Sequence, residues 1–345
     1  MKALTLVGTG GLESLRVQEL PEPTIQSPDQ VLVQVRAAGL NRLDLLVVEG
    51  LPGVTYKFPH IVGSDAAGLV REVGSAVQRL APGERVMVNP TLSCGQCPAC
   101  GAGEESLCAR LRVLGEHCPG TVAEYLVVPA ANLARVPETM PWAKAASFSL
   151  ATLTAWRMLR TRANLQAGET VLIWGIGGGV ALAALQIARL LGARTIVTSG
   201  SAGKLELATR LGADVVLDHG QADIAAEVRR LTAGRGADVV VDSVGEKTWP
   251  ASLRAISRGG RLVICGATSG PMVSLDLRRL FWHQWSLLGS TLGNQREYAE
   301  IVRLAEAGQL WPVVDGVVPL DDALTAYERL KHGQQTGKLV IEVTQ

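Results

Sequence analysis

The middle of the chain alternates short apolar runs with segments of helical periodicity. The apolar run Val171–Trp174 breaks into a cluster of glycines, and Val180–Leu191 then places small and apolar residues at helical spacing. A second apolar run, Arg194–Ser199, is followed by a helix-like segment, Gly203–Leu211, and by a third run, Val215–Asp218. Strands and helices that alternate in this way are typical of a doubly wound α/β fold with a parallel sheet.

The alternation continues to about residue 288 and then gives way to another pattern. Three further apolar runs are predicted strands of the same sheet: Ala237–Asp242, Gly260–Gly266 and Trp285–Gly289. After them the periodicity predicts two helices and a last strand: Gln295–Ala307, Leu320–His332 and Lys338–Val343.

The first 150 residues read as β-rich, because short apolar or alternating runs are separated by Pro-Gly turns. Strands are predicted at Val31–Ala37, within Ile61–Val73, at Glu84–Val88 and at Tyr125–Val128. A helical region is predicted to begin at Leu153–Leu159 and to lead into the glycine cluster.

Length and composition narrow the class of protein. The chain has 345 residues, which suggests two domains, and 47% of them are hydrophobic. Lys and Arg number 33 against 32 Asp and Glu, so no excess of basic charge favours a nucleic-acid partner. No apolar stretch of about 18 residues is free of charges and glycines, so no membrane span is expected. Glu13 closely follows a short apolar run, which is unlike a signal peptide, and a cytoplasmic location is expected.

Four of the six cysteines crowd into one short segment: Cys94, Cys97, Cys100 and Cys108. This spacing lets a loop wrap one Zn²⁺ tetrahedrally, and four thiolate ligands leave no position open for substrate. The sequence therefore predicts one structural zinc per chain. An iron–sulfur cluster uses similar ligands, and free thiols are the other alternative.

The glycine cluster is predicted to bind a dinucleotide. Glycines allow a tight turn and a close approach of backbone to phosphate, and the N–H groups at the start of the following helix face the anion. An ordinary strand-to-helix connection is the alternative. The second strand ends in Thr198–Ser201, followed by Lys204, with no carboxylate to repel a 2′-phosphate. NADP(H) is therefore the predicted coenzyme, unless Lys204 is only a solvated helix charge.

The chain resembles the medium-chain dehydrogenase/reductase superfamily, which includes the zinc alcohol dehydrogenases and the quinone oxidoreductases. The resemblance covers nearly the whole chain. It rests on the cysteine segment, the glycine turn and these motifs: AAGLNRLDLLVVEG (37–50), FPHIVGSDAAGLVREVG (58–74), GTVAEYLVVPAANLARVP (120–137), AASFSLATLTAWRML (145–159) and GKLVIEV (337–343).

The resemblance implies a Rossmann domain at 150–289 and a β-rich, GroES-like domain built from 1–149 and 290–345. The cysteines would form a zinc lobe at about 90–110 within the latter. The resemblance also implies a nicotinamide coenzyme, a small-molecule substrate in the cleft between the domains, and a homodimer or homotetramer.

The chain also departs from the zinc alcohol dehydrogenases at positions that bear on its function. Those enzymes carry a catalytic Cys where this chain has Asn41, a His-Glu pair where it has Ser64-Asp65, and a second Cys or an Asp where it has Leu150. Three of the usual zinc-ligand positions are therefore Asn, Ser and Leu, and the proton-relay hydroxyl falls on Leu43. A catalytic zinc needs about three protein ligands, so no catalytic metal is predicted. The pattern around Asn41 resembles the quinone oxidoreductase branch, which reduces quinones or activated C=C bonds.

Three residues are predicted to serve catalysis. Asn41 is the expected donor to the negative charge that develops on the substrate, and a role in capping backbone is the alternative. By analogy with the family, Asp44 is expected to pair with Lys338 and support the site. The alternative is an ion pair on the surface that has no effect on function. Tyr56 is a candidate proton donor, with packing as its alternative.

The predicted coenzyme-binding residues follow the glycine turn and the ends of the strands. They are Thr154, Gly177, Gly178, Gly179, Val180, Ser199, Ser201, Lys204, His219, Gly266 and Lys338.

Three functions compete on these observations. The leading one is an NADPH-dependent reductase of quinones or enones with one structural zinc. The second is an alcohol or aldehyde dehydrogenase with unusual zinc ligands, Asp65 with His60 or His117. The third is a protein that binds NADPH without turnover.

Overall fold

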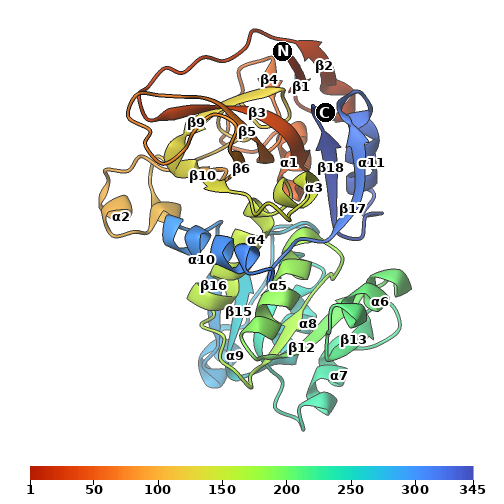
Figure 1. The fold of residues 1–345 in the computed structure, drawn as a ribbon. Helices are drawn as coiled ribbons and strands as arrows, with labels where there is room; N and C mark the ends of the chain where they lie inside the picture. The colour runs from red at the N-terminus through yellow and green to blue at the C-terminus, as the bar shows by residue number, and fades with distance from the viewer. Residues whose placement is uncertain (345) are drawn as a thin grey trace. The chain divides into compact units, whose positions relative to one another are not determined.

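The computed structural model describes residues 1–344, which form two compact units (Figure 1). The N-terminal unit comprises Met1–Ala151 and Gly293–Gln345, and the central unit comprises Thr152–Leu292. Helix α4 (Ser149–Trp156) contains the first boundary between them. No helix among the described residues combines the length and the apolar character that a membrane crossing requires.

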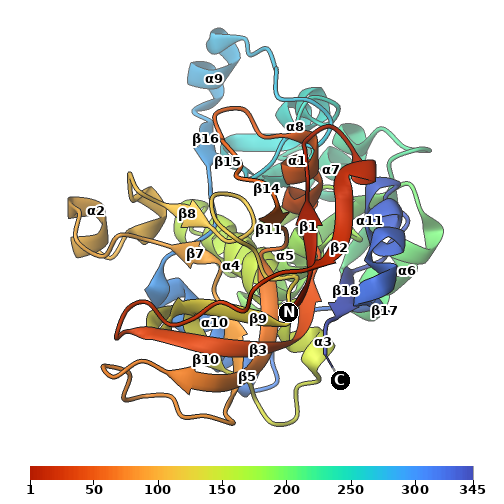
Figure 2. The ribbon, with the colours of Figure 1, turned by 90° about the horizontal axis from the view of Figure 1, so that it is seen from above.

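The N-terminal unit is organised around a sheet of seven strands in the order β10-β6-β5-β3-β18-β17, with β9 also paired to β3. The view in Figure 2 shows β9, β3 and β5 lying side by side. The strands are β3 (Gln30–Gly39), β5 (Asp65–Val73), β6 (Arg85–Val88), β9 (Tyr125–Pro129), β10 (Leu133–Arg135), β17 (Val314–Pro319) and β18 (Lys338–Glu342). Strand β18 pairs antiparallel with β3, so the end of the chain does join the N-terminal strands, as expected.

Smaller elements complete this unit. A three-stranded sheet has the order β2-β1-β4 and a two-stranded one joins β7 to β8. Their bounds are β1 (Lys2–Leu6), β2 (Leu15–Glu19), β4 (His60–Ile61), β7 (Thr91–Leu92) and β8 (Arg112–Val113). The helices are α1 (Arg42–Glu49), α2 (Pro98–Gly101), α3 (Trp142–Ala145), α10 (Gln295–Glu306) and α11 (Ala323–Lys331).

The central unit is a six-stranded sheet in the order β13-β12-β11-β14-β15-β16, and every neighbouring pair is parallel. Its strands are β11 (Thr170–Ile173), β12 (Arg194–Ser199), β13 (Val215–Asp218), β14 (Ala237–Asp242), β15 (Ile256–Ile264) and β16 (Ser286–Gly289). Its helices are α5 (Gly179–Leu190), α6 (Ala202–Arg210), α7 (Ile224–Leu231), α8 (Trp249–Ala255) and α9 (Leu277–His283). The doubly wound order predicted from the apolar runs is confirmed.

Two differences from the sequence prediction have local causes. Strand β15 begins at Ile256 rather than Gly260, because Ile256 already pairs with Ala237 before an irregularity in the ladder. The helical region after α4 continues as a π-helix over Arg157–Arg162, a wider winding that apolar periodicity does not reveal.

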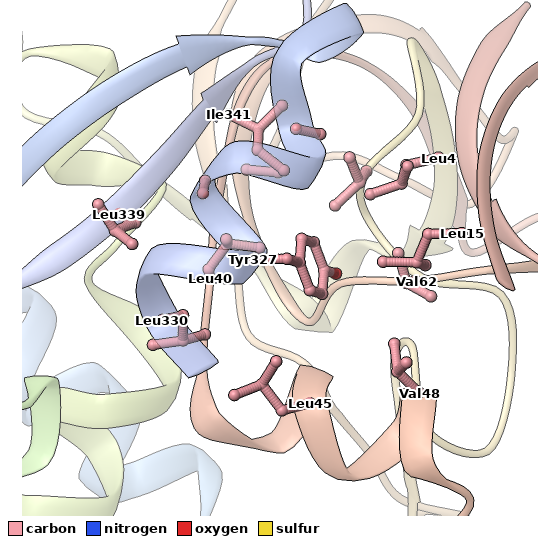
Figure 3. Close-up of a cluster of buried hydrophobic side chains, with 14 of the residues drawn as sticks. Leu4, Leu15, Leu40, Leu45, Val48, Val62, Tyr327, Leu330, Leu339 and Ile341 are labelled. Atoms are coloured by element: carbon pink, nitrogen blue, oxygen red, sulfur yellow. The ribbon is translucent and has the colours of Figure 1, made fainter. Parts of the chain in front are cut away.

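A buried apolar cluster holds α1, α11 and β18 together in the N-terminal unit (Figure 3). Tyr327 of α11 is fully buried, and around it lie Leu4, Leu15, Leu40, Leu45, Val48, Val62, Leu330, Leu339 and Ile341. Leu45 and Val48 belong to α1, so their burial fixes the helix whose first turn carries Asn41 and Asp44.

Candidate functional site

Four buried polar side chains meet in the N-terminal unit. Asn41, Asp44, Asp65 and Lys338 are 7%, 1%, 0% and 4% exposed. Lys338 Nζ donates to Asp65 Oδ2 at 3.1 Å and to Asn41 Oδ1 at 2.5 Å. Asn41 Nδ2 donates to the same Asp65 oxygen at 3.0 Å. These residues form a closed network, which we call the Lys338 cluster.

Strand pairing explains why residues so distant in sequence converge. Gly39 at the end of β3 lies opposite Asp65, the first residue of β5, and opposite Val340 of β18. Lys338 opens β18 two residues earlier. Asn41 lies two residues after the end of β3 and caps α1, so its side chain reaches the same point. The two ladders therefore place a carboxylate, an amide and an ammonium together.

The remaining carboxylate oxygen of the cluster is also satisfied. Asp65 Oδ1 accepts the backbone N–H of Leu150 at 2.8 Å, and the Thr121 hydroxyl donates to the Asp65 carbonyl at 3.0 Å. Ser64 is turned elsewhere, since its hydroxyl donates to the Leu114 carbonyl at 2.8 Å. A buried ion pair with its lone pairs satisfied in this way is compatible with the low-dielectric interior.

This network corrects the predicted pairing of Asp44 with Lys338. The hydrogen-bonded partner of the ammonium is Asp65. Asp44 instead accepts the backbone N–H of Asn41 at 2.6 Å, and the two residues form the capping box of α1. Both ends of the Asn41 amide are engaged by side chains of the cluster, and its role as a donor toward substrate stays a prediction.

A catalytic zinc does not fit these residues. The positions at which the resemblance places zinc ligands hold an amide, a hydroxyl bonded to backbone, a carboxylate paired with an ammonium, and leucine. Over residues 1–344, the four clustered cysteines are the one group of three or more His, Cys, Asp or Glu side chains placed to hold a metal. Asp65 is therefore not assembled with His60 and His117 into an alternative site.

Burial changes the titration of the Asp44 carboxyl. Desolvation raises the pKa of its carboxyl to about 7, and this outweighs the lowering by the Asn41 N–H and by the charge of Lys338. The folded protein therefore keeps the proton at a pH where the unfolded chain, with a pKa of 3.8, has lost it. The stability gained from this proton is complete below about pH 4 and is lost as pH rises toward 7.

We expect Asp44→Asn to flatten this dependence. Asparagine can still accept the Asn41 N–H but does not titrate, and one group contributes about 1.4 kcal/mol per pH unit at most. The free energy of unfolding of the variant, minus that of the wild type, should rise by about 2.5 kcal/mol from pH 5 to pH 8 in urea titrations. The exposed Asp321→Asn is the control, and an equally flat difference for both variants would contradict the assignment.

Tyr56 lies apart from this hydrogen-bonded network. Its hydroxyl is buried and has no hydrogen-bond partner among the described residues. Its ring packs edge-on against His60, with centroids 5.1 Å apart, and burial raises the pKa of its hydroxyl. The structure thus shows the packing role directly, while its role as a proton donor stays a prediction.

The four clustered cysteines converge as predicted. Their sulfur atoms all lie within 4.8 Å of one another, and none forms a disulfide. Cys94 Sγ lies 3.9 Å from Cys100 Sγ, a separation that suits two corners of a zinc–thiolate tetrahedron. Hydrogen bonding to the backbone, chiefly at Gln96, lowers the pKa of the Cys94 thiol to about 5, which favours the thiolate. These residues fit a closed, structural zinc site.

In the central unit, the glycine turn joins β11 to α5. Gly175 and Gly177 have φ of 68° and 121°, values that favour glycine, and Gly178 caps α5. A Cβ on Gly177 would lie 2.5 Å from Lys204 Cδ, whereas one on Gly178 would meet nothing within 4 Å. The backbone at the start of α5 is therefore open to an anion, and the lysine lies beside it.

The ends of the neighbouring strands bring further predicted residues to this edge of the sheet. Ser199 ends β12, Ser201 caps α6 and donates its N–H to Ser199 Oγ at 3.1 Å, and Lys204 lies in the first turn of that helix. His219 follows β13, with Nδ1 3.4 Å from Thr198 Oγ1. The Trp174 side chain is buried, and its indole N–H has no hydrogen-bond partner among the described residues. The centroids of the Trp174 and His219 rings are 6.5 Å apart. This donor set fits the ribose and phosphate of a dinucleotide.

The other predicted coenzyme residues occupy expected elements. Gly179 and Val180 open α5, Gly266 follows β15, and Thr154 lies in α4. Lys338 is the exception, because it belongs to the N-terminal unit and is engaged with Asp65. The sequence suggests a role for Asp65 only as a weak metal ligand. Its position at the start of an apolar strand gives no sign of a partner 273 residues away.

Comparison with known proteins agrees with this architecture. The family described as "Alcohol dehydrogenase GroES-like domain" matches residues 27–138, and "Zinc-binding dehydrogenase" matches residues 179–307. An "NAD-dependent alcohol dehydrogenase" of Saccharolobus solfataricus is 32% identical, with 99% of each chain covered. An "Acryloyl-coenzyme A reductase" of Metallosphaera sedula is 31% identical, again with 99% of each covered.

A solved structure described as an "NAD-dependent alcohol dehydrogenase" is 43% identical, covers 100% of both chains and superposes with a TM-score of 0.96. The two family matches together span much of the chain, and the likeness to this solved structure extends over its full length. The chain belongs to the medium-chain dehydrogenase/reductase superfamily and is an oxidoreductase of the nicotinamide-dependent kind.

Proposed function

We propose that this protein is an NADP(H)-dependent reductase of quinones, enones or related activated double bonds, with one structural zinc and no catalytic metal. The observation that carries the proposal is the ion pair of Asp65 with Lys338, at the place where a metal-dependent relative would hold its ion. The relative named as an acryloyl-coenzyme A reductase supports the same chemistry, because its name specifies reduction of a conjugated C=C bond.

When bound, the coenzyme supplies the hydride. The chain's own residues hold the dinucleotide and orient it. The open backbone at Gly178 would face the phosphates of a bound coenzyme, and the hydroxyls of Ser199 and Ser201 would be available to the ribose and its substituent. With no ion to polarise the substrate, rate enhancement comes from holding the reactants together and from fixed dipoles and charges.

The preference for NADP(H) is supported by the end of β12. No carboxylate follows Ser199 in the turn to α6, and Lys204 lies beside the glycine turn. A carboxylate at this point would repel a 2′-phosphate, whereas an ammonium attracts one. The names of several relatives specify NAD, so coenzyme choice is a direct test of this reading.

We expect Lys204→Ala to weaken NADPH binding selectively. A hydrogen bond to a charged group contributes about 1.5–3 kcal/mol, so the Kd for NADPH should rise by roughly 10-fold or more. The Kd for NADH should change by less than about 2-fold. Arg210→Ala, at the other end of α6, is the matched control. Equal losses for both coenzymes, measured by fluorescence titration, would remove Lys204 from the phosphate site.

The function itself is tested by metal content and by a substrate panel. Purified protein should contain one zinc per chain, and it should oxidise NADPH with quinones or enones faster than it reduces simple aldehydes. Two zinc ions per chain, with ethanol or aldehyde turnover dominant, would instead support the alcohol dehydrogenase reading that the 43% identical structure suggests. Tight NADPH binding without turnover on any substrate would support a binding protein.

A further inference from the structure

We propose that Asp242 is a positioning residue for the coenzyme: its buried carboxylate fixes two loops of the central unit against which the nicotinamide nucleotide binds. This role rests on the proposed function in one respect, because it requires the central unit to bind a nicotinamide dinucleotide. All the residues involved belong to that unit. Asp242 does not itself touch the coenzyme and acts through the backbone of the loops.

The Asp242 side chain holds both ends of the segment that joins β14 to α8. Asp242 is the last residue of β14 and is 1% exposed. Its Oδ1 accepts the backbone N–H groups of Val244 at 2.8 Å and of Gly245 at 3.1 Å. Its Oδ2 accepts the hydroxyls of Thr248 at 2.7 Å and of Ser252 at 3.0 Å. Hydrogen bonds to a buried carboxylate are strong, so this segment is held firmly to the end of the strand.

The segment 243–248 is in turn tied to the loop 265–270, which follows β15. The N–H and the hydroxyl of Ser269 both donate to the Val244 carbonyl at 2.8 Å. The Ser269 hydroxyl also accepts the N–H of Lys247 at 3.0 Å. The two segments therefore pack as one block, which we call the loop block. The buried carboxylate at the end of β14 is the side-chain anchor of this block.

The loop block is closely packed and lies beside the glycine turn. A Cβ on Gly245 would lie 2.7 Å from the Gly270 carbonyl oxygen, and Gly245 has a φ of 91°, a value that favours glycine. A Cβ on Gly175 would lie 3.5 Å from Val244 Cγ2, which is an ordinary van der Waals contact. The block therefore adjoins the turn that follows β11.

The order of the strands indicates which part of the coenzyme the loop block meets. A doubly wound sheet has two mononucleotide-binding halves, and the dinucleotide lies outside the carboxyl ends of the strands where their order reverses. In this sheet the order reverses between β11 and β14. The half from β11 to β13 carries Ser199 and Lys204, which are proposed to hold the adenosine ribose and its phosphate. The nicotinamide nucleotide is therefore left to the half from β14 to β16, where the loop block follows β14 and β15.

The rate of hydride transfer depends on how precisely the nicotinamide ring is held, and a misplacement of about 1 Å can cost about 100-fold. Loss of the Asp242 carboxylate should release both ends of the segment 243–248, and the loop bonded to it through Ser269 should shift with it. The adenosine nucleotide is bound by other strands. Its affinity should therefore be unchanged, which is not expected of general damage to the fold.

Three variants test the role of the carboxylate. Asp242→Ala removes the hydrogen bonds to all four partners. Asp242→Asn keeps one oxygen for the two N–H groups, and the hydroxyls can accept from its new NH2 group. Thr248→Val removes only one donor to the carboxylate. The matched control is Asp214→Ala, because Asp214 accepts the N–H and the hydroxyl of Thr195 at 2.7 and 2.8 Å, near the amino end of β12 in the same sheet.

Two measurements need no substrate. Calorimetric titration gives the Kd for NADPH and for 2′,5′-ADP, a fragment that has the adenosine ribose and both of its phosphates but no nicotinamide. The fluorescence anisotropy of bound NADPH reports how firmly its nicotinamide ring is held. The third measurement is the single-turnover rate of NADPH oxidation by the best wild-type substrate at saturating coenzyme.

Asp242→Ala should raise the Kd for NADPH by about 10-fold and leave that for 2′,5′-ADP within about 2-fold of wild type. Its single-turnover rate should fall by about 100-fold, and the anisotropy of bound NADPH should fall with it. Asp242→Asn should recover most of both losses, and Thr248→Val should lose about 10-fold in rate. Asp214→Ala should keep wild-type binding and rate, although it unfolds at a lower urea concentration.

Three results would overturn the role of Asp242: wild-type affinity and rate in Asp242→Ala, equal losses for NADPH and 2′,5′-ADP, or the same losses in Asp214→Ala. If Asp242→Ala does not fold, a Thr248→Val protein with the wild-type rate has the same meaning. Failure of the proposed function is distinguishable from these. A wild type that prefers NADH, or that reduces aldehydes, refutes that assignment, and the comparison is then made with NADH and 5′-AMP or with the aldehyde. A wild type that binds neither coenzyme refutes both proposals.

Discussion

Replacement of Cys100 by serine is expected to remove the zinc from the protein altogether. The four sulfur atoms lie within 4.8 Å of one another, and without the fourth thiolate a water or the serine hydroxyl must complete the tetrahedron as a weaker ligand, so the ion should be lost during purification with a chelator. Structural zinc sites contribute on the order of 10 kcal/mol of binding free energy in small peptides, so the segment from Cys94 to Cys108 should lose its ordered conformation. Metal analysis should fall from one zinc per chain to none.

Cys118→Ser provides the matched control, because Cys118 is outside this group of sulfur atoms. It should keep the zinc, and limited proteolysis should cut only the Cys100→Ser variant within the lobe. The lobe is tied to the rest of its unit where Glu105 accepts the N–H of Gln295 at the start of α10, so the loss should also loosen that helix. A Cys100→Ser protein with one tightly bound zinc would show that the ion lies elsewhere.

Lys338→Met is expected to be the most destabilising single change in the Lys338 cluster. It would leave the Asp65 carboxylate, 0% exposed, without a counter-ion, and removal of one partner of a buried ion pair costs about 3–5 kcal/mol. The double variant Asp65→Asn/Lys338→Met should recover most of this loss, because it removes both charges. Urea denaturation at pH 7 gives the comparison.

A small penalty for the single variant would contradict this account. If Lys338→Met lies within about 1 kcal/mol of the wild type, the Asp65 carboxylate does not depend on the ammonium as its counter-ion.

The central unit could be predicted closely because its signals are local. Strands of a parallel sheet are buried on both faces and appear as continuous apolar runs such as Ala237–Asp242, which matches β14 residue for residue. The cysteine group was equally accessible, since its ligands lie within one short segment. In both cases the neighbours in space are also neighbours in sequence.

The Lys338 cluster was predicted only in part because its contacts are long-range. Asn41 and Asp44 were identified as site residues, but Asp44 was assigned the lysine that Asp65 holds. Both acids precede or begin regular elements, and choosing between them requires the ladder that sets Gly39 opposite Asp65. Side-chain periodicity carries no information on such pairing. Coenzyme preference and assembly into a dimer or tetramer stay predictions.

The position of β18 has a consequence for how the protein is made. This strand lies between β3 and β17 in the sheet, yet in sequence it follows the whole central unit. The contiguous stretch from Thr152 to Leu292 is therefore synthesised before β18 and can fold during translation. The ladders that join β18 to β3 and to β17 can form only after that stretch has been made.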